Sequence, residues 1–238
     1  MNVALIIAGG SGVRMGQDIP KQFLNVFDKP IVIYTLEHFQ RHDKIDAIAV
    51  VCLKGWEKVI ETYSNQFGIA KLKWIIEGGR DVHESIRNGL VYLKDYCKPN
   101  DNVIIHDGIR PMVAKSVISD CIEMCDKHGN GIASLPIYEQ IFRTDDKLST
   151  DEYIPRDKIM CLQTPQAYKF GLISNAYERA FRENIGMPYS SYANTMMVEM
   201  GERLYFSQGS SKNIKITTTD DLEIFKALLK AGKDEWLK

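Results

Sequence analysis

Five short apolar runs, separated by stretches with helical periodicity, constrain the fold of this chain more than any other feature. The runs cover residues 3–8, 47–52, 72–76, 102–106 and 131–136. Several are apolar at consecutive positions, as strands covered on both faces of a parallel sheet are. Between them, helical patterns occupy residues 30–41, 56–67, 83–96 and 114–129. This alternation predicts an α/β fold with a mostly parallel sheet flanked by helices.

The regular alternation ends after Pro136. Residues 137–160 contain extended apolar segments around a polar turn at residues 144–147, and we interpret them as a β-arm that protrudes from the sheet. We expect the remaining elements to be two helices, a strand and a final helix, at residues 169–184, 190–200, 204–207 and from Thr219 onward. Since no repeat or long linker divides the sequence, we predict a single domain over residues 1–238 with the arm inserted in it.

Composition excludes several functional classes. The chain has 238 residues, of which 45% are hydrophobic and 26% charged, and this suits an ordered α/β domain. The net charge of -1 provides no basic field, so we expect no nucleic-acid partner. The first apolar run is too short to span a membrane and lacks the cations of a signal peptide, so we expect a cytoplasmic protein without a membrane partner. The five cysteines follow no metal-binding spacing.

A glycine-rich turn, Gly-Gly-Ser-Gly at residues 9–12, directly follows the first apolar run. Glycines let backbone amides approach a phosphate. The turn lacks the Lys-Ser/Thr of a P-loop, and Met15 stands where a dinucleotide fingerprint requires its third glycine. Arg14 and Lys21 follow closely. Two cations on one loop repel each other unless an anion lies between them, so we favour a triphosphate site.

The ends of other predicted strands offer further candidates, because ligands of parallel sheets bind at the carboxyl ends of strands. Asp107 ends the fourth run, and a carboxylate beside a phosphate site suits Mg²⁺. Arg110 follows three residues later and is placed to bind a second anionic group. The third run leads into Gly78-Gly79, which allows a flat base to approach the backbone, and Ser85 offers a hydroxyl at a helix start.

Five motifs together resemble a known family. In chain order they are AGGSGVRMG with PKQF, EGG with ES, HDGIRP, QTPQ and NIKITTTDDL. This order is similar to the cytidylyltransferases of polyol phosphates, which include a 2-C-methyl-D-erythritol 4-phosphate enzyme and a ribitol 5-phosphate enzyme. The resemblance covers nearly the whole chain. It implies a Rossmann-like, GT-A-like nucleotidyltransferase fold, a β-arm that exchanges across a homodimer, and conversion of CTP and a polyol phosphate to a CDP-polyol and pyrophosphate with Mg²⁺.

The resemblance also implies roles for individual residues. The implied catalytic residues are Arg14, Lys21 and Lys215. The implied nucleotide-binding residues are Ala8, Gly9, Gly10, Gly79, Ser85, Asp107 and Gly108, with Asp107 also on the metal. The implied residues for the polyol phosphate are Arg110, Gln140, Arg156, Thr164 and Lys215. Because Arg156 is on the arm, we expect it to act on the substrate of the neighbouring subunit.

The sequence departs from the pattern of the 2-C-methyl-D-erythritol 4-phosphate enzyme at residues expected to lie near the polyol. Gln140 stands where that enzyme has a threonine, and residues 191–195 replace an acidic Thr-Asp-Asp-Ala stretch. These changes favour a linear alditol phosphate, such as ribitol 5-phosphate, for a surface polysaccharide or teichoic-acid-type polymer. Three alternatives remain: the 2-C-methyl-D-erythritol 4-phosphate enzyme of the non-mevalonate isoprenoid pathway, a non-catalytic nucleotide-binding subunit, and a nucleotidyltransferase for another base or sugar phosphate.

Overall fold

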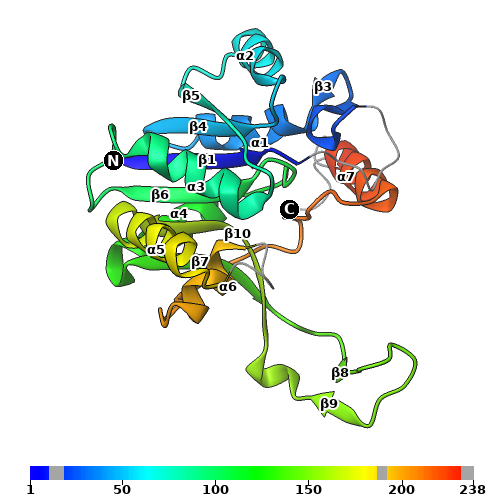
Figure 1. The fold of residues 1–238 in the computed structure, drawn as a ribbon. Helices are drawn as coiled ribbons and strands as arrows, with labels where there is room; N and C mark the ends of the chain where they lie inside the picture. The colour runs from blue at the N-terminus through cyan, green and yellow to red at the C-terminus, as the bar shows by residue number, and fades with distance from the viewer. Residues whose placement is uncertain (11–18, 187–191, 232–238) are drawn as a thin grey trace.

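A central seven-stranded sheet organises the computed structural model, which describes residues 1–10, 19–186 and 192–231 (Figure 1). The strand order is β11-β7-β10-β6-β1-β4-β5. The strands are β1 (Asn2–Ala8), β4 (Ala47–Cys52), β5 (Leu72–Glu77), β6 (Asn102–Asp107), β7 (Asn130–Pro136), β10 (Met160–Lys169) and β11 (Phe206–Gln208). Strands β5, β4, β1 and β6 are parallel neighbours, whereas β10 runs antiparallel to both β6 and β7. The expected mixed, mostly parallel sheet is therefore confirmed.

Strand β10 lies in the middle of the sheet, and the sequence interpretation missed it. The sequence pattern assigns these residues to the end of the arm and to the QTPQ motif. Pro165 has no N–H for a sheet ladder, which argues against a central strand, and the pattern around it does not alternate. The structure accommodates Pro165 because the register with β7 shifts between Leu162 and Gln166.

Helices cover both faces of the sheet. They are α1 (Ile31–Gln40), α2 (Glu57–Gln66), α3 (Val82–Leu93), α4 (Lys115–His128), α5 (Phe170–Glu183), α6 (Ala193–Glu199) and α7 (Thr219–Ala231). Along β1, Ala4 and Ile6 contribute to the core shared with α1, α2 and α4, whereas Val3 and Leu5 contribute to the core shared with α3, α5 and α6. Gly89 lets α3 approach β1, because a Cβ there would lie 2.8 Å from a Leu5 methyl. The continuous apolar runs thus reflect burial on both faces.

A third, smaller core positions the segment that carries Lys215. Phe225 of α7 packs with Ile216 and with Ile109, which follows β6. At the start of α7, the Asp221 carboxylate accepts the main-chain N–H groups of Thr217 and Thr218, each at 2.8 Å. The segment before α7 is thereby held across the carboxyl end of β6. The predicted start of this helix at Thr219 is confirmed.

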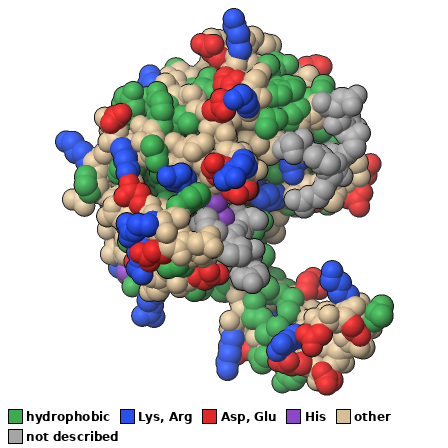
Figure 2. All heavy atoms as spheres, viewed as in Figure 1, with side chains coloured by type: hydrophobic (Ala, Val, Ile, Leu, Met, Phe, Trp, Pro, Cys, Tyr) green, Lys and Arg blue, Asp and Glu red, His purple; other side chains and the backbone are tan. Residues whose placement is uncertain are grey.

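The predicted arm is present and projects away from the sheet (Figure 1). Its two antiparallel strands are β8 (Ile141–Arg143) and β9 (Glu152–Ile154), and a 3-10 turn, Arg156–Lys158, leads back to β10. Hydrophobic side chains are visible on its surface (Figure 2). More than half of each of four large apolar side chains is exposed: Tyr138, Phe142, Leu148 and Tyr153. A lone two-stranded ribbon is marginally stable in water, so these side chains are expected to find a partner.

A short hairpin of β2 (Asn25–Val26) and β3 (Lys29–Pro30) precedes α1 and was not expected from the sequence. Among the residues that the structure describes, no helix is long and apolar enough to cross a membrane.

Candidate active site

A glycine-lined pocket of about 230 Å³ lies at the carboxyl ends of β1 and β5. Gly9 and Gly10 line it from the end of β1, and Gly79 and Ser85 line it from the loop and helix that follow β5. The structure therefore brings together four of the residues predicted to bind nucleotide. Ala8, the last residue of β1, is buried directly beneath them.

Close packing explains the residue types in this pocket. A Cβ on Gly79 would lie 2.4 Å from the Cβ of Glu84, so the loop requires glycine there. The Ser85 hydroxyl accepts the Gly79 N–H at 3.0 Å and donates to the Asp81 carbonyl at 2.7 Å. Asp81 caps α3 by accepting the Glu84 N–H at 2.8 Å. Ser85 thus braces the loop that forms one wall of the pocket.

Gln22 fixes the segment of Lys21 against the first strand. Its side-chain amide donates to the carbonyls of Ala8 and Gly10, both at 2.8 Å, and is buried. Lys21 begins the 3-10 helix Lys21–Phe23, so its backbone is anchored next to the end of β1 through the neighbouring Gln22. The sequence interpretation assigned no role to Gln22, although it lies within the PKQF motif. Arg14 lies outside the described residues, so its predicted role stays a prediction.

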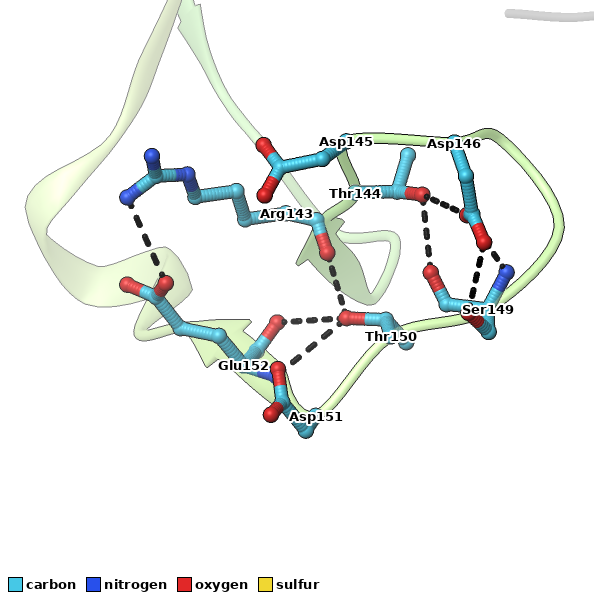
Figure 3. A pocket seen from close by; sticks show the side chains of 8 residues that line it. All are labelled: Arg143, Thr144, Asp145, Asp146, Ser149, Thr150, Asp151 and Glu152. Carbon is cyan, nitrogen blue, oxygen red and sulfur yellow. Dashed lines mark hydrogen bonds and ion pairs between the residues drawn. The ribbon is translucent and has the colours of Figure 1, made fainter.

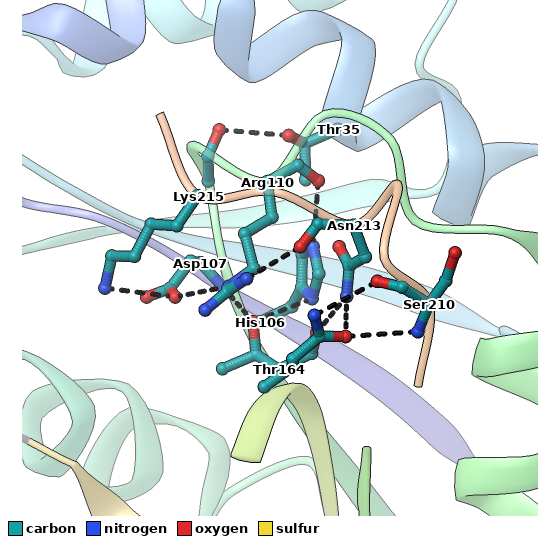
Figure 4. A network of polar contacts seen from close by, with 10 residues as sticks. Thr35, His106, Asp107, Arg110, Thr164, Ser210, Asn213 and Lys215 are labelled. Atoms are coloured by element: carbon teal, nitrogen blue, oxygen red, sulfur yellow. Dashed lines mark hydrogen bonds and ion pairs between the residues drawn. The ribbon is translucent and has the colours of Figure 1, made fainter. Parts of the chain in front are cut away.

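Two cations converge on one carboxylate at the end of β6 (Figure 4). Lys215 Nζ and Arg110 Nε each lie 3.1 Å from Oδ2 of Asp107. Burial alone would raise the pKa of Asp107, but Lys215 and then Arg110 hold it below its ordinary value. The carboxylate is therefore charged and paired. Gly108 follows in a tightly packed position, since a Cβ there would lie 3.1 Å from the Ile7 carbonyl.

A buried polar network supports this cluster from behind. The Asp107 N–H donates to Thr164 Oγ1 at 3.1 Å, and the same hydroxyl lies 3.1 Å from Nδ1 of His106. The Asn213 side chain donates to the Thr164 carbonyl at 2.7 Å. The sequence suggested only that His106 is an oriented strand-end residue, and it gave no signal for Asn213 beyond the NIKIT motif.

A second pocket, of about 290 Å³, opens beside the Asp107 cluster. Arg110 is the one charged residue of its lining and Leu162 the one aliphatic residue, and the other six side chains carry uncharged polar groups: Gln163, Thr164, Gln166, Tyr192, Asn194 and Thr195. The ring of Tyr192 also faces Lys215, whose Nζ lies 5.1 Å from the ring centre. The described part of the segment predicted to meet the polyol thus lies beside Arg110 and Thr164.

The remaining two predicted substrate residues are not part of this group within one chain. Gln140 and Arg156 lie on the arm, and Arg156 Nη1 donates to the Tyr138 carbonyl at 2.6 Å. The arm extends away from the sheet edge that holds Asp107 (Figure 1). Neither residue lines this chain's own pocket, and the expected contact of Arg156 with the substrate of a neighbouring subunit stays a prediction, as does the role of Gln140.

A hollow of about 630 Å³ lies on the arm, remote from the strand ends (Figure 3). The acidic side chain of Asp146 stabilises the turn that it lines by accepting hydrogen bonds from the main chain. Asp146 Oδ1 accepts the N–H groups of Leu148 and Ser149 at 2.8 and 2.9 Å, and Thr150 bridges the two strands. We interpret this hollow as the surface of a well-bonded turn.

Taken together, a glycine-lined pocket at the ends of parallel strands adjoins a cationic cluster around one carboxylate. This is the arrangement of a nucleotidyltransferase, in which charge stabilisation carries most of the chemistry.

The sequence model of the IspD family, described as 2-C-methyl-D-erythritol 4-phosphate cytidylyltransferase, matches residues 2–231, and the chain belongs to this family. It is 52% identical over 230 residues to a ribitol-5-phosphate cytidylyltransferase of Lacticaseibacillus paracasei, covering 97% of this chain and 98% of that protein. It is 35% identical over 233 residues to a 2-C-methyl-D-erythritol 4-phosphate cytidylyltransferase of Clostridium novyi, covering 96% of each.

Solved structures agree with this assignment. The 2-C-methyl-D-erythritol 4-phosphate cytidylyltransferase of Francisella tularensis superimposes with a TM-score of 0.80 at 28% identity, covering 95% of this chain and 99% of that one. The predicted family, the nucleotidyltransferase fold and the cytidylyltransferase class are therefore confirmed.

Proposed function

We propose that this protein transfers the cytidylyl group of CTP to a linear alditol phosphate, ribitol 5-phosphate or a close analogue, and releases pyrophosphate. The observation that carries the proposal is the pocket beside Asp107, Arg110 and Lys215, in which six of the eight lining residues have uncharged polar side chains. Uncharged polar groups such as Asn194 and Thr195 suit a chain of hydroxyls. Ribitol-5-phosphate cytidylyltransferases at 52% and 36% identity support the same substrate.

The reaction needs no general base, because the attacking phosphate oxygen is already anionic. That oxygen forms a bond to the α-phosphorus of CTP while the bond from the α-phosphorus to the bridging oxygen breaks, and pyrophosphate leaves. The main obstacle is repulsion between two anionic substrates. Lys21, on the segment anchored next to the end of β1, is assigned to the departing pyrophosphate, and Arg110 and Lys215 to the incoming phosphate monoester.

Mg²⁺ is proposed as the cofactor, with Asp107 as its protein ligand. Among the described residues no group of three or more His, Cys, Asp or Glu side chains forms a complete metal site. A single carboxylate nevertheless suits Mg²⁺, which commonly takes one or two carboxylates and completes its shell with phosphate oxygens and water. Bound Mg²⁺ would neutralise phosphate charge. The Asp107 carboxylate, charged at neutral pH, is available to it when Arg110 and Lys215 turn to the substrate.

We also propose a homodimer that the arm joins. The exposed apolar side chains of the arm, among them Phe142 and Tyr153, would be buried against a second copy. The same contact would bring Arg156 and Gln140 to the partner's polyol phosphate. A cytoplasmic location fits the use of CTP and the five free cysteines, and CDP-ribitol would serve surface-polymer synthesis.

A nucleotide panel tests the cytidylyl assignment. Purified protein with Mg²⁺ and ribitol 5-phosphate is given CTP, UTP, ATP or GTP, and pyrophosphate release is measured. We expect CTP to be strongly preferred, because uracil lacks the 4-amino donor of cytosine and would leave buried acceptors of the site unpaired. Equal rates with CTP and UTP would contradict the proposal, and no release with any nucleotide would favour a non-catalytic nucleotide-binding protein.

A further inference from the structure

Arg110 and Thr164 are bridged twice, once through His106 and once through Asn213 (Figure 4). His106 Nδ1 lies 3.1 Å from the Thr164 hydroxyl, and its Nε2 lies 3.2 Å from the Arg110 carbonyl. The side-chain amide of Asn213 donates to the main-chain carbonyl of Thr164 at 2.7 Å. The main-chain carbonyl of Asn213 accepts a hydrogen bond from Arg110 Nη1, also at 2.7 Å. These four residues close a hydrogen-bonded ring, which we call the His106–Asn213 bracket.

The direction of each hydrogen bond in the bracket follows from its partners. A carbonyl oxygen only accepts, so His106 Nε2 must carry the proton that faces Arg110. In a neutral imidazole Nδ1 is then an acceptor, and the Thr164 hydroxyl donates to it. Thr164 Oγ1 meanwhile accepts the Asp107 N–H. Burial lowers the pKa of His106 to about 3, which agrees with a neutral ring at neutral pH.

The bracket joins three segments that are distant in the chain. His106 and Arg110 belong to the end of β6 and the turn after it, Thr164 to β10, and Asn213 to the segment that reaches Lys215 two residues later. The turn and this segment meet again where Ile216 N–H donates to the Ile109 carbonyl at 2.9 Å. Both His106 and Asn213 are fully buried. The positions of the two cations therefore depend on side chains that no substrate can reach.

We propose that His106 and Asn213 are positioning residues for the second substrate: they hold Arg110 and Lys215 where the phosphate monoester binds, without touching it. This inference rests on the proposed function. Because Ser85 and Gln22 organise the CTP pocket independently of the bracket, damage to the bracket should affect the polyol phosphate and spare CTP.

Two substitutions of His106, each of which keeps one of its two hydrogen-bonding positions, test whether KM for the polyol phosphate changes while KM for CTP does not. His106→Gln retains a donor near the Nε2 position, and His106→Asn retains an acceptor near the Nδ1 position. We expect His106→Asn to raise KM for the polyol phosphate about tenfold, the effect of losing one buried hydrogen bond. His106→Gln should raise it less, because the Arg110 carbonyl keeps its donor. KM for CTP should change less than about twofold in both.

Asn130→Ala is the matched control for general loss of a buried polar network. Asn130 is buried at the opposite end of the sheet. Like the side chain of Asn213, its side chain bonds the main chain of a distant segment: it donates to the Arg203 carbonyl and accepts the Tyr205 N–H. We expect it to lower Tm without changing the ratio of the two KM values. The proposal is overturned if His106→Asn shifts both KM values in parallel, or shifts neither.

The proposed function and this inference fail in different ways. If the wild-type enzyme uses another polyol phosphate, the proposed function fails, and the same KM ratio measured with that substrate still decides the inference. A readout without turnover is the ¹⁵N NMR spectrum of histidine-labelled protein. The bracket requires His106 with its proton on Nε2, and a proton on Nδ1 would contradict it.

Discussion

Lys215 Nζ lies 3.1 Å from Oδ2 of Asp107, and Arg110 Nε lies at the same distance from the same oxygen. The single carboxylate therefore keeps two cations together in a site that contains no other anion among the described residues of the cluster. In the proposed reaction, an arriving phosphate monoester takes over part of that role. This relationship explains why the site tolerates two cations side by side before the substrates bind.

Removing the charge of Asp107 should strongly lower activity. In Asp107→Asn, we expect turnover to fall roughly 10²-fold or more, because the proposed ligand for Mg²⁺ weakens and Lys215 and Arg110 lose the group that orients them. The control is Asp43→Asn, which removes an exposed carboxylate paired with Lys115. Steady-state pyrophosphate release checks both variants. Near-normal turnover of Asp107→Asn would show that this carboxylate is not part of the machinery.

Lys21→Ala should lower kcat by roughly 10²-fold, the scale of losing one preorganised charge in the transition state. Tm should barely change, because the buried anchor of this segment is Gln22 rather than Lys21. Lys115→Ala, at an exposed ion pair, is the matched control and should be neutral. We expect the same loss for Arg14→Ala from the sequence alone. A Lys21→Ala enzyme with unchanged kcat would remove this residue from the leaving-group site.

Charges on the apolar surface of the arm should separate the subunits. We expect the wild-type protein to be a dimer by light scattering at micromolar concentration, and the double variant Phe142→Asp/Tyr153→Asp to be a monomer with an intact Tm. Val198→Asp, at an exposed apolar residue outside the arm, should remain dimeric. Loss of activity in the monomer would agree with action of Arg156 across the interface. A monomeric wild-type protein would contradict the proposed homodimer and the action of Arg156 across its interface.

Stability should fall as the pH drops below about 6.5. Burial lowers the pKa of His38, His42 and His106 in the folded protein, that of His106 to about 3. Between its folded and unfolded pKa values each histidine binds protons more readily when the chain is unfolded, so acid favours unfolding, by up to about 1.4 kcal/mol per pH unit for a group such as His106. Thermal unfolding at pH 7.5, 6 and 5 measures this. An unchanged Tm over that range would contradict it.

The sequence could predict the strands that carry continuous apolar residues, because a strand buried on both faces has apolar residues at consecutive positions. It could not predict β10, in which Pro165 and polar residues of the second pocket interrupt the pattern. That Gly9, Gly79 and Ser85 line one pocket could be predicted, because the carboxyl ends of parallel strands meet at the same edge of a sheet. The bracket was not, because His106 and Asn213 acquire their roles from partners in distant segments.

The measurement that tests the account most directly compares two second substrates. With CTP and Mg²⁺ at saturation, kcat/KM is determined for ribitol 5-phosphate and for 2-C-methyl-D-erythritol 4-phosphate, and the products are identified by mass. The uncharged polar side chains in the second pocket predict a clear preference for ribitol 5-phosphate and a CDP-ribitol product, because a methyl group leaves hydrogen-bonding groups unpaired. A higher kcat/KM for the methyl-erythritol substrate would contradict the account and assign the protein to isoprenoid synthesis.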